Sequence, residues 1–256
     1  WIMRKCYCYV QRQLLRIVIG GCWQKIYQKN SMQKLNTYDF GGKSMGTKKM
    51  IVMTESSKFK NNCVAGIDVN TGDWVRIVSD DENIHGALTN EDITYEDGTM
   101  CQVMDVVSVP YISNVPTASQ PENILIDRKY YIEKQGKATL GDVLAIHPDE
   151  MHNYLFGTRY SSVKEEYLEE LGVNYSLTLI KGSNLTFRWK PNNDGLLKLK
   201  LTFSYNGIEY TDMSVTDPEF YGIEDGISLS DAYIVVSIGT PYNGACYKFV
   251  AKIFQI

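Results

Sequence analysis

The stretch Cys63–Ser79, CVAGIDVNTGDWVRIVS, places two short apolar runs on either side of a polar turn. Runs rich in Val and Ile that are joined by Asn, Gly and Asp predict a β-hairpin, here with its turn at Asn70–Asp73. On the second strand Trp74 and Arg76 share one face, because side chains alternate along a strand. Burying an unpaired Arg is costly, so Arg76 must reach a partner, a ligand or solvent.

Three further apolar or β-branched runs of the first half predict strands, at Met50–Thr54, Met100–Val109 and Glu122–Glu133. We expect Pro110 to end the second of them, because proline cannot extend a ladder inside a sheet. A capping-box pattern at Thr139–Asp142 predicts a short helix that stops at His147. A second such pattern at Ser162–Glu165, with apolar residues at helical spacing up to Gly172, predicts a helical connector.

The second half has the clearest strand pattern. Lys198–Tyr205, KLKLTFSY, alternates throughout, with Leu and aromatic residues on one face and Lys, Thr and Ser on the other. Asn206 and Gly207 follow it and give a strong hairpin signal. A two-residue loop pairs Tyr205 with Ile208, which keeps the apolar residues of both strands on one face. Further strands are predicted at 175–181, 185–190, 233–238 and 247–256.

About five strands in each half, with one helix in the first, predict a mainly β protein with minor α content. All-β modules of this size usually close to remove their edges, so we expect two small, partly open β-barrels joined by the helical connector. The corresponding segments are 48–150 for the first barrel, 151–173 for the connector and 174–256 for the second barrel. Residues 1–47 are expected to be a basic leader outside the fold.

Charge separates this leader from the rest of the chain. Residues 1–48 carry nine Lys or Arg against one acidic residue, a net charge of +8, whereas the other 208 residues carry 17 against 29, a net charge of −12. The leader lacks the pattern of a secretory signal, and its longest apolar stretch is too short to span a membrane. We interpret it as translated upstream sequence, in which Gly41–Lys43 is encoded by a purine-rich ribosome-binding run and the true start is Met45 or Met50. Gly42–Ser44 resembles the end of a phosphate-binding loop, but Thr37 stands where that motif needs Gly.

An acidic body disfavours a broad phosphate-binding surface, so a nucleic-acid site should be local. Residues 175–256 are near neutral, with seven basic and eight acidic residues, which makes the second barrel the better candidate. Its candidate ligand-binding residues are outward basic side chains and nearby Tyr and Lys residues: Arg188, Lys190, Lys198, Lys200, Tyr205, Tyr247 and Lys248. Outward Lys on an edge strand is also a common protection against aggregation, and that alternative stays open.

On the first barrel, Lys58, Trp74 and Arg76 could form a binding rim, with the Arg side chain paired to phosphate. The alternative, which we favour, is that Arg76 pairs with a structural acid such as Asp68 and that Trp74 belongs to the core.

No catalytic residue, metal ligand or cofactor site is predicted. The chain has no CxxC pair and no HExxH motif, and no Ser/His/acid or Cys/His set has a recognisable spacing. The run His147–His152 contains two His and two acids, but metal sites that close on so short a loop are uncommon. Asp217 is interpreted as a turn residue that ends a strand.

Three stretches together are similar to the bacterial dual OB-containing domain family: Cys63–Ser79, Ser214–Pro218 (SVTDP) and Val236–Ile253 (VSIGTPYNGACYKFVAKI). The resemblance covers roughly residues 48–256. The family pattern has Trp-Ile-Arg-Pro-Val in the first hairpin; here Trp74 and Arg76 are retained, and Val and Ile replace the family's Ile and Pro. The resemblance implies two OB-like barrels, a place in bacterial defence or conflict systems and nucleic-acid or nucleotide sensing, without catalytic residues.

The residues and the resemblance together lead us to expect a non-enzymatic, cytoplasmic binding module that senses single-stranded nucleic acid or nucleotides in a bacterial defence system. The main alternative is a protein-interaction adaptor, since the net charge of −12 disfavours nucleic-acid affinity. A nuclease or hydrolase is a third possibility without a visible site. Neither a cofactor nor a membrane is expected as a partner.

Overall fold

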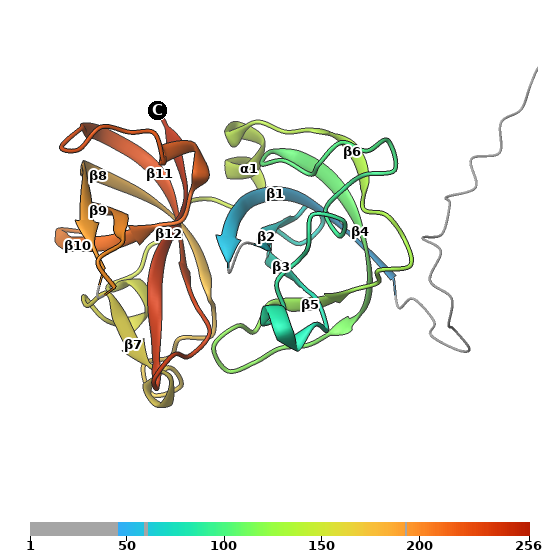
Figure 1. Cartoon of the computed structure of the whole chain (residues 1–256), viewed down its shortest axis with the longest axis horizontal. Coiled ribbons are helices and arrows are strands. Elements are labelled where there is room, and N and C mark those ends of the chain that lie inside the picture. The colour runs from blue at the N-terminus through green and yellow to red at the C-terminus, as the bar shows by residue number, and fades with distance from the viewer. Residues whose placement is uncertain (1–45, 59–60, 193) are drawn as a thin grey trace, which may run out of the picture. The chain divides into compact units, whose positions relative to one another are not determined.

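The computed structural model of the chain describes residues 46–58, 61–192 and 194–256 (Figure 1). All of them belong to one compact unit. The basic leader and Gly42–Ser44 lie outside the described residues, so what the sequence predicts for them stays a prediction.

The first half of the described chain forms a sheet that closes on itself. Its elements are β1 (Gly46–Lys58), β2 (Asn61–Asp68), β3 (Trp74–Val78), β4 (Asp105–Asn114), β5 (Asn123–Ile126), β6 (Glu133–Lys137) and the helix α1 (Leu140–Ile146). The strand order is β1-β2-β3-β5-β4-β6, and β1 also pairs with β4, so β1 to β5 form a five-stranded barrel. Within it β3 and β5 run parallel.

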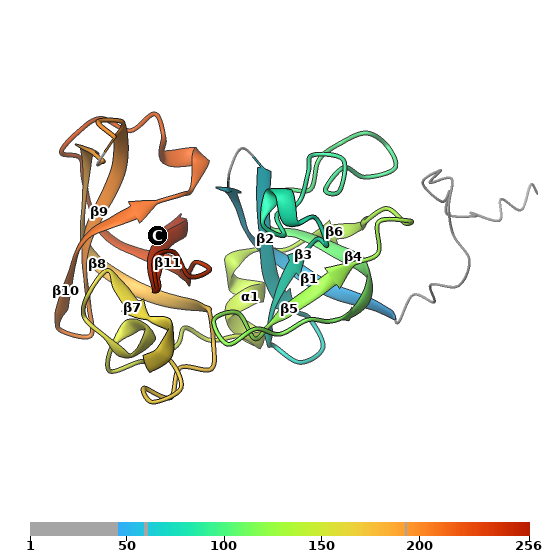
Figure 2. The same ribbon diagram turned by 60° about the horizontal axis from the view of Figure 1, so that its bottom comes forward.

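The second half repeats this arrangement, drawn in yellow to red in Figures 1 and 2. Its strands are β7 (Ser162–Lys164), β8 (Leu177–Pro191), β9 (Leu197–Tyr205), β10 (Ile208–Val215), β11 (Ser228–Ile238) and β12 (Ala245–Gln255). The order is β10-β9-β8-β11-β12-β7, and β10 also pairs in parallel with β12, which closes β8 to β12 into a barrel. In both barrels the first strand therefore pairs with the second and fourth, and the third pairs in parallel with the fifth. A short 3-10 helix follows the third strand of each barrel, at Glu82–Ile84 and Pro218–Phe220.

This topology confirms the predicted fold class, a mainly β protein with two OB-like barrels. Both predicted hairpins are also confirmed: β2 pairs with β3, and Tyr205 of β9 pairs with Ile208 of β10. Asn206 and Gly207 have φ angles of 49° and 74°, the left-handed values that a two-residue hairpin turn requires. The capping box at Thr139 forms as predicted and begins α1.

The prediction that Pro110 ends its strand is wrong, because β4 starts later and passes through it. Pro110 lies where β4 changes partner, from β6 at Asp105–Ser108 to β5 at Tyr111–Asn114. Its carbonyl accepts a hydrogen bond from Asp127 N at 3.0 Å. A proline without an N–H group is tolerated at such an interruption of the ladder. The strand predicted at Glu122–Glu133 is likewise two strands, because it holds β5 and the first residue of β6.

The α-helix predicted from Ser162–Glu165 is also wrong. Residues Ser162–Lys164 form β7 and pair with Ala245–Tyr247 of β12. The helical character of the connector is confined to 3-10 helices at Leu155–Gly157 and Glu165–Tyr167. Val163 is buried in the second core, so tertiary pairing outweighs the local helix signal. The segment boundaries at 150 and 173 stay predictions.

Each barrel encloses its own apolar core, and a third cluster is shared by both barrels. We call it the inter-barrel cluster; its buried members are Ile51, Met53, Ala65, Ile67, Val143, Leu177, Leu179, Val235 and Ala251. In β1, Met50 and Val52 belong to the first core, whereas the alternate residues Ile51 and Met53 belong to the inter-barrel cluster. These strands are therefore covered on both faces, which is why their sequences are apolar at consecutive positions.

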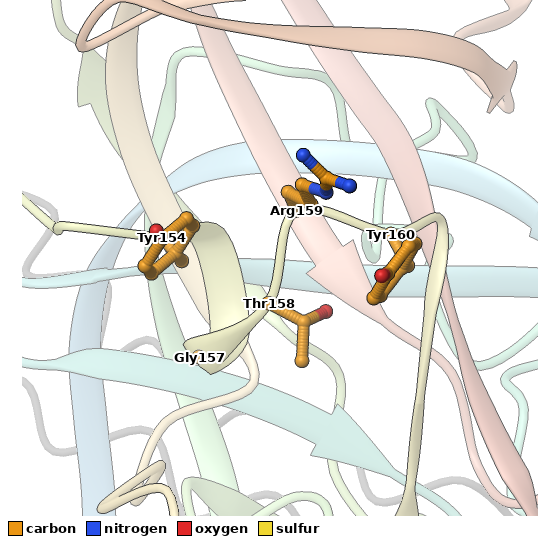
Figure 3. Close-up of a pocket in the computed structure, with 5 residues that line it drawn as sticks. All are labelled: Tyr154, Gly157, Thr158, Arg159 and Tyr160. Carbon is orange, nitrogen blue, oxygen red and sulfur yellow. The ribbon is translucent and has the colours of Figure 1, made fainter.

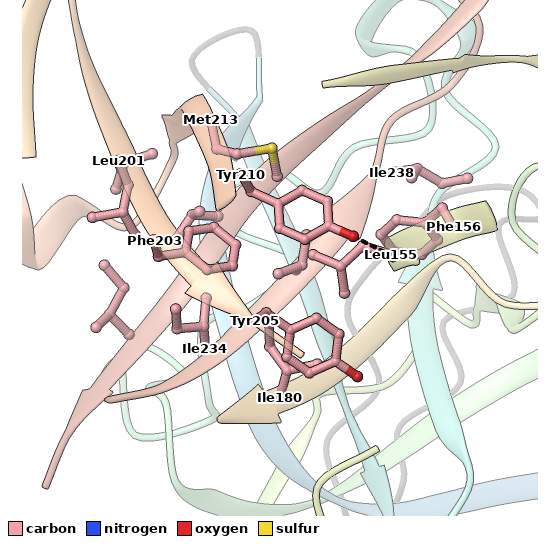
Figure 4. Close-up of a cluster of buried hydrophobic side chains, with 14 of the residues drawn as sticks. Leu155, Phe156, Ile180, Leu201, Phe203, Tyr205, Tyr210, Met213, Ile234 and Ile238 are labelled. Carbon is pink, nitrogen blue, oxygen red and sulfur yellow. Dashed lines mark hydrogen bonds between the residues drawn. The ribbon is translucent and has the colours of Figure 1, made fainter. Parts of the chain in front are cut away.

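The connector closes the second core. Leu155 and Phe156 are buried within it, as Figure 4 shows, and Tyr210 and Tyr175 fasten them. Leu155 N donates to the Tyr210 hydroxyl at 2.9 Å, and Phe156 N donates to the Tyr175 hydroxyl at 3.2 Å. Tyr210 thus buries its ring and Tyr175 packs its partly buried ring against Phe156, while the hydroxyl of each satisfies a backbone amide.

Candidate functional site

Arg76 joins the two barrels instead of facing solvent. Arg76 is 7% exposed. Its Nη2 donates to the hydroxyl of Ser176, which directly precedes β8, at 2.8 Å. The same nitrogen lies 3.6 Å from a carboxylate oxygen of Glu122, to which the Ser176 hydroxyl also donates. Arg76 is therefore paired with a structural acid, as the favoured alternative expected. The expected partner Asp68 is wrong, however, because Asp68 pairs with Lys48 at 2.8 Å.

Trp74, another residue of the binding rim predicted on the first barrel, does not form a surface with Arg76. Trp74 is half-buried, packs against the inter-barrel cluster and makes an edge contact with His147, with ring centroids 5.4 Å apart. Its Nε1 is buried without a hydrogen-bond partner among the described residues. The side chain of Lys58 lies outside the described part of the chain. The outer face of β2 and β3 is thus occupied by the contact with the second barrel.

The structure brings four of the predicted basic residues together on the second barrel. Arg188 lies opposite Lys200, and Lys190 lies opposite Lys198, on the paired strands β8 and β9. We call these four residues the basic strip. Perfect alternation along β9 buries Leu199 and Leu201 and turns the lysines outward.

Two carboxylates partly neutralise the basic strip, and a hydroxyl accepts a hydrogen bond from a third member. Arg188 lies 3.4 Å from Asp225, and Lys190 lies 2.7 Å from Asp212. Lys200 donates to the Ser214 hydroxyl at 2.7 Å, and partial burial lowers the pKa of its ammonium group. Lys198 is exposed, and no ion pair involves it among the described residues.

Two of the remaining predicted ligand residues are buried in the second barrel. Tyr205 is 3% exposed; its hydroxyl accepts from His152 N at 2.6 Å and donates to Glu150 O at 3.0 Å. Lys248 is 2% exposed, and burial lowers the pKa of its ammonium group to about 7. This placement gives both side chains partners inside the protein, whereas Tyr247 on β12 is exposed.

Lys248 fixes the connector through hydrogen bonds. Its Nζ lies 2.6 Å from the carbonyl oxygens of Leu155 and Thr158 and 3.0 Å from the Thr158 hydroxyl. Three acceptors compensate part of the cost of burying the ammonium group. Side chains of β10 and β12 therefore fix the connector, and no local sequence pattern indicates this arrangement.

Sequence reasoning also missed a pocket on this connector. Tyr154, Gly157, Thr158, Arg159 and Tyr160 line an open pocket of about 310 Å³ (Figure 3). The closely spaced aromatic and basic residues of TRY at 158–160 were the available signal.

The polar residues of the run His147–His152 have separate structural partners. His147 Nδ1 lies 2.8 Å from Gly72 O, Glu150 accepts from Leu179 N at 3.1 Å, and His152 Nε2 lies 2.9 Å from the Thr178 hydroxyl. Burial lowers the pKa of His147, but the Glu150 carboxylate, 3.8 Å from His147 Nε2, outweighs it, and the net shift is upward. Asp217 caps the 3-10 helix after β10, as its assignment to a turn expected.

Comparison with known proteins decides the family. A sequence profile described as the dual OB-containing domain matches residues 48–253. The chain belongs to the dual OB-containing domain family. No curated protein matches the sequence.

Among solved structures, this dual OB-containing chain is similar to the crystal structure of the tetrameric p202 HIN2. The two share 8% sequence identity and a TM-score of 0.31, over 83% of this chain and 94% of that chain. The likeness is distant, and no conclusion about function follows from it. Within the described residues, no helix has the length and apolar character needed to cross a membrane.

Removing the Arg76 side chain should destabilise the protein. Arg76→Ala leaves Glu122 and Ser176 buried without their cationic partner, so we expect a loss of about 3–5 kcal/mol in the free energy of unfolding. Urea denaturation measures this loss. Arg188→Ala is the control, because its exposed ion pair should contribute only about 0–1 kcal/mol. Equal losses in the two variants would contradict a structural role for Arg76.

Burial of Lys248 predicts a pH-dependent stability. The folded-state pKa of about 7 lies below the ordinary lysine value, so between pH 7 and pH 10 the unfolded chain binds a proton that the folded chain does not. Raising the pH through this window should therefore stabilise the wild type relative to Lys248→Met. Unfolding free energies of both proteins at pH 7 and pH 9.5 measure the effect. A difference between them that does not change with pH would show that the buried amine keeps its proton.

Proposed function

We propose that the protein binds single-stranded nucleic acid through the basic strip on the second barrel. OB barrels bind oligonucleotides over the face of their second and third strands and the flanking loops. In the first barrel these strands are β2 and β3: Ala65 and Ile67 of β2 belong to the inter-barrel cluster, and Trp74 of β3 packs against it. In the second barrel they are β9 and β10, and the outward residues of β9 are not buried. This difference between the two barrels is the observation that carries the proposal.

The chemistry of the basic strip suits phosphate groups. Cross-strand neighbours in a sheet have Cβ atoms about 5 Å apart, so the two pairs place four positive charges in a compact patch. Exposed ion pairs such as those of Arg188 and Lys190 contribute little stability, so phosphates can compete with Asp225 and Asp212 for the cations.

Tyr205, one of the two tyrosines predicted to bind ligand, is not part of this surface, because it is buried. The outward residues of β8 and β9 from Thr186 to Ser204 include Arg, Lys, Thr and Ser. Contacts to phosphates therefore dominate over base stacking, and the binding is sequence-independent and sensitive to salt. The family resemblance supports assigning this binding to a non-enzymatic sensor in the cytoplasm of a bacterium, within a defence system.

A protein-interaction adaptor is the second candidate, and one observation favours it. Leu196 and Leu197, at the start of β9, are 61% and 62% exposed and adjacent in sequence. A pair of exposed leucines beside a hairpin turn can insert into an apolar groove of a partner. Such binding would be insensitive to salt, unlike phosphate binding.

Loss of two lysines of the strip should weaken oligonucleotide binding and its salt dependence. For Lys198→Ala/Lys200→Ala, removal of two phosphate contacts should reduce the slope of log affinity against log salt by about 1.4. Fluorescence anisotropy with a labelled 20-residue oligothymidine, measured from 50 to 200 mM salt, gives the slopes. Lys137→Ala on β6 is the control, since that side chain is 61% exposed on the first barrel.

An affinity that is unchanged in the double variant, or equally reduced by Lys137→Ala, would overturn the assignment of the site. Absence of oligonucleotide binding by the wild type would overturn the function itself. In that case, salt-insensitive partner binding that is lost in Leu196→Ser/Leu197→Ser would establish the adaptor.

A further inference from the structure

The pocket on the connector combines exposed aromatic rings with a cation. Tyr154 is 46% exposed and Tyr160 is 63% exposed, and Figure 3 shows their rings on either side of the turn that carries Thr158. Large exposed aromatic side chains around a concave surface are typical of ligand sites. Its volume of about 310 Å³ lies at the lower end of the range for small-molecule pockets.

Arg159 is positioned to bind an anion. Its guanidinium carbon lies 5.5 Å from the centre of the Tyr160 ring, so the ring orients the cation without neutralising its charge. No ion pair involves Arg159 among the described residues, and the five residues that line the pocket include no carboxylate. A planar guanidinium in this setting can take phosphate oxygens through two parallel hydrogen bonds.

Buried contacts hold the backbone of the pocket in one conformation. Phe156 and Gly157 have φ angles of 48° and 73°, and the left-handed conformation of Phe156 is costly for a bulky residue. The burial of Phe156 and the hydrogen bonds from Lys248 to Thr158 maintain this turn. The Lys248 amine donates to the carbonyl oxygen of the pocket residue Thr158 and so fixes its position. The rings and the guanidinium are therefore presented by a preorganised loop.

We propose that this pocket binds a nucleotide, with the base stacked on Tyr154 and the phosphate on Arg159. Tyr160 is a positioning residue that orients Arg159. The ligand is either a free nucleotide or the terminal nucleotide of an oligonucleotide, since both present the same base and phosphate. The pocket shares no residue with the basic strip, so the proposal holds or fails independently of binding at the strip.

Calorimetric titration of the full chain with ATP tests the free nucleotide. Base stacking on an aromatic side chain and a charged hydrogen bond each predict a loss of about tenfold or more in affinity for Tyr154→Ala and for Arg159→Ala. Adenosine lacks the phosphate, so it should bind the wild type more weakly than ATP does. Arg159→Ala should bind adenosine and ATP with about equal affinity. Tyr242→Ala and Lys137→Ala are controls with exposed side chains outside both the pocket and the basic strip, and both should bind ATP like the wild type.

A second titration, with oligothymidine carrying or lacking a 5′-phosphate, distinguishes the two sources. A preference for the phosphorylated end that disappears in Tyr154→Ala and Arg159→Ala identifies the terminal nucleotide as the ligand. The proposal is overturned if the two pocket variants bind both ATP and the phosphorylated oligonucleotide as the wild type does. It is equally overturned if ATP affinity is lost in Arg188→Ala but kept in Arg159→Ala, because the nucleotide then lies on the basic strip.

Discussion

The contact between the two barrels determines which surfaces of this protein can bind a ligand. Strands on both sides of the contact bury consecutive residues, such as Ile51 beside Val52 and Leu179 beside Ile180, because one face lines a barrel and the other lines the inter-barrel cluster. The outer face of β2 and β3 is a usual ligand surface of an OB barrel, but here it is buried in this contact. The equivalent surface of the second barrel, formed by β9 and β10, stays open at β9, which carries Lys198 and Lys200 of the basic strip.

Burying polar groups at the contact costs free energy, but it also makes the docking of the two barrels specific. Arg76, Glu122 and Ser176 are buried together, and the Arg76 Nε has no hydrogen-bond partner among the described residues. Burying such an ion pair gains little net stability, but removing one partner is strongly destabilising. A second set of buried polar groups, the tyrosine hydroxyls and Lys248, fixes the connector over the second core. We infer that these polar contacts fix how the barrels and the connector dock, while the apolar clusters supply most of the stability.

Sequence alone predicted the elements whose signal is local. The alternation of Lys198–Tyr205, the turn at Asn206 and the capping box at Thr139 all act within a few residues, and the structure contains each of them. Contacts between distant residues could not be predicted this way. Arg76 meets Ser176 from 100 positions away, and β7 forms because β12 pairs with it, against the helical pattern of its own residues. The consecutive apolar residues of Met50–Met53 did carry a signal of two-sided burial, which pattern reading took only as a strand.

Lysine footprinting tests whether the open face of the second barrel binds nucleic acid. The full chain is acetylated with and without a saturating 20-residue oligothymidine, and modification of each lysine is measured by mass spectrometry. We expect the oligonucleotide to protect Lys190 and Lys198 of the basic strip, while Lys137 on the first barrel reacts equally in both samples. Protection of first-barrel lysines, with Lys190 and Lys198 unchanged, would contradict it.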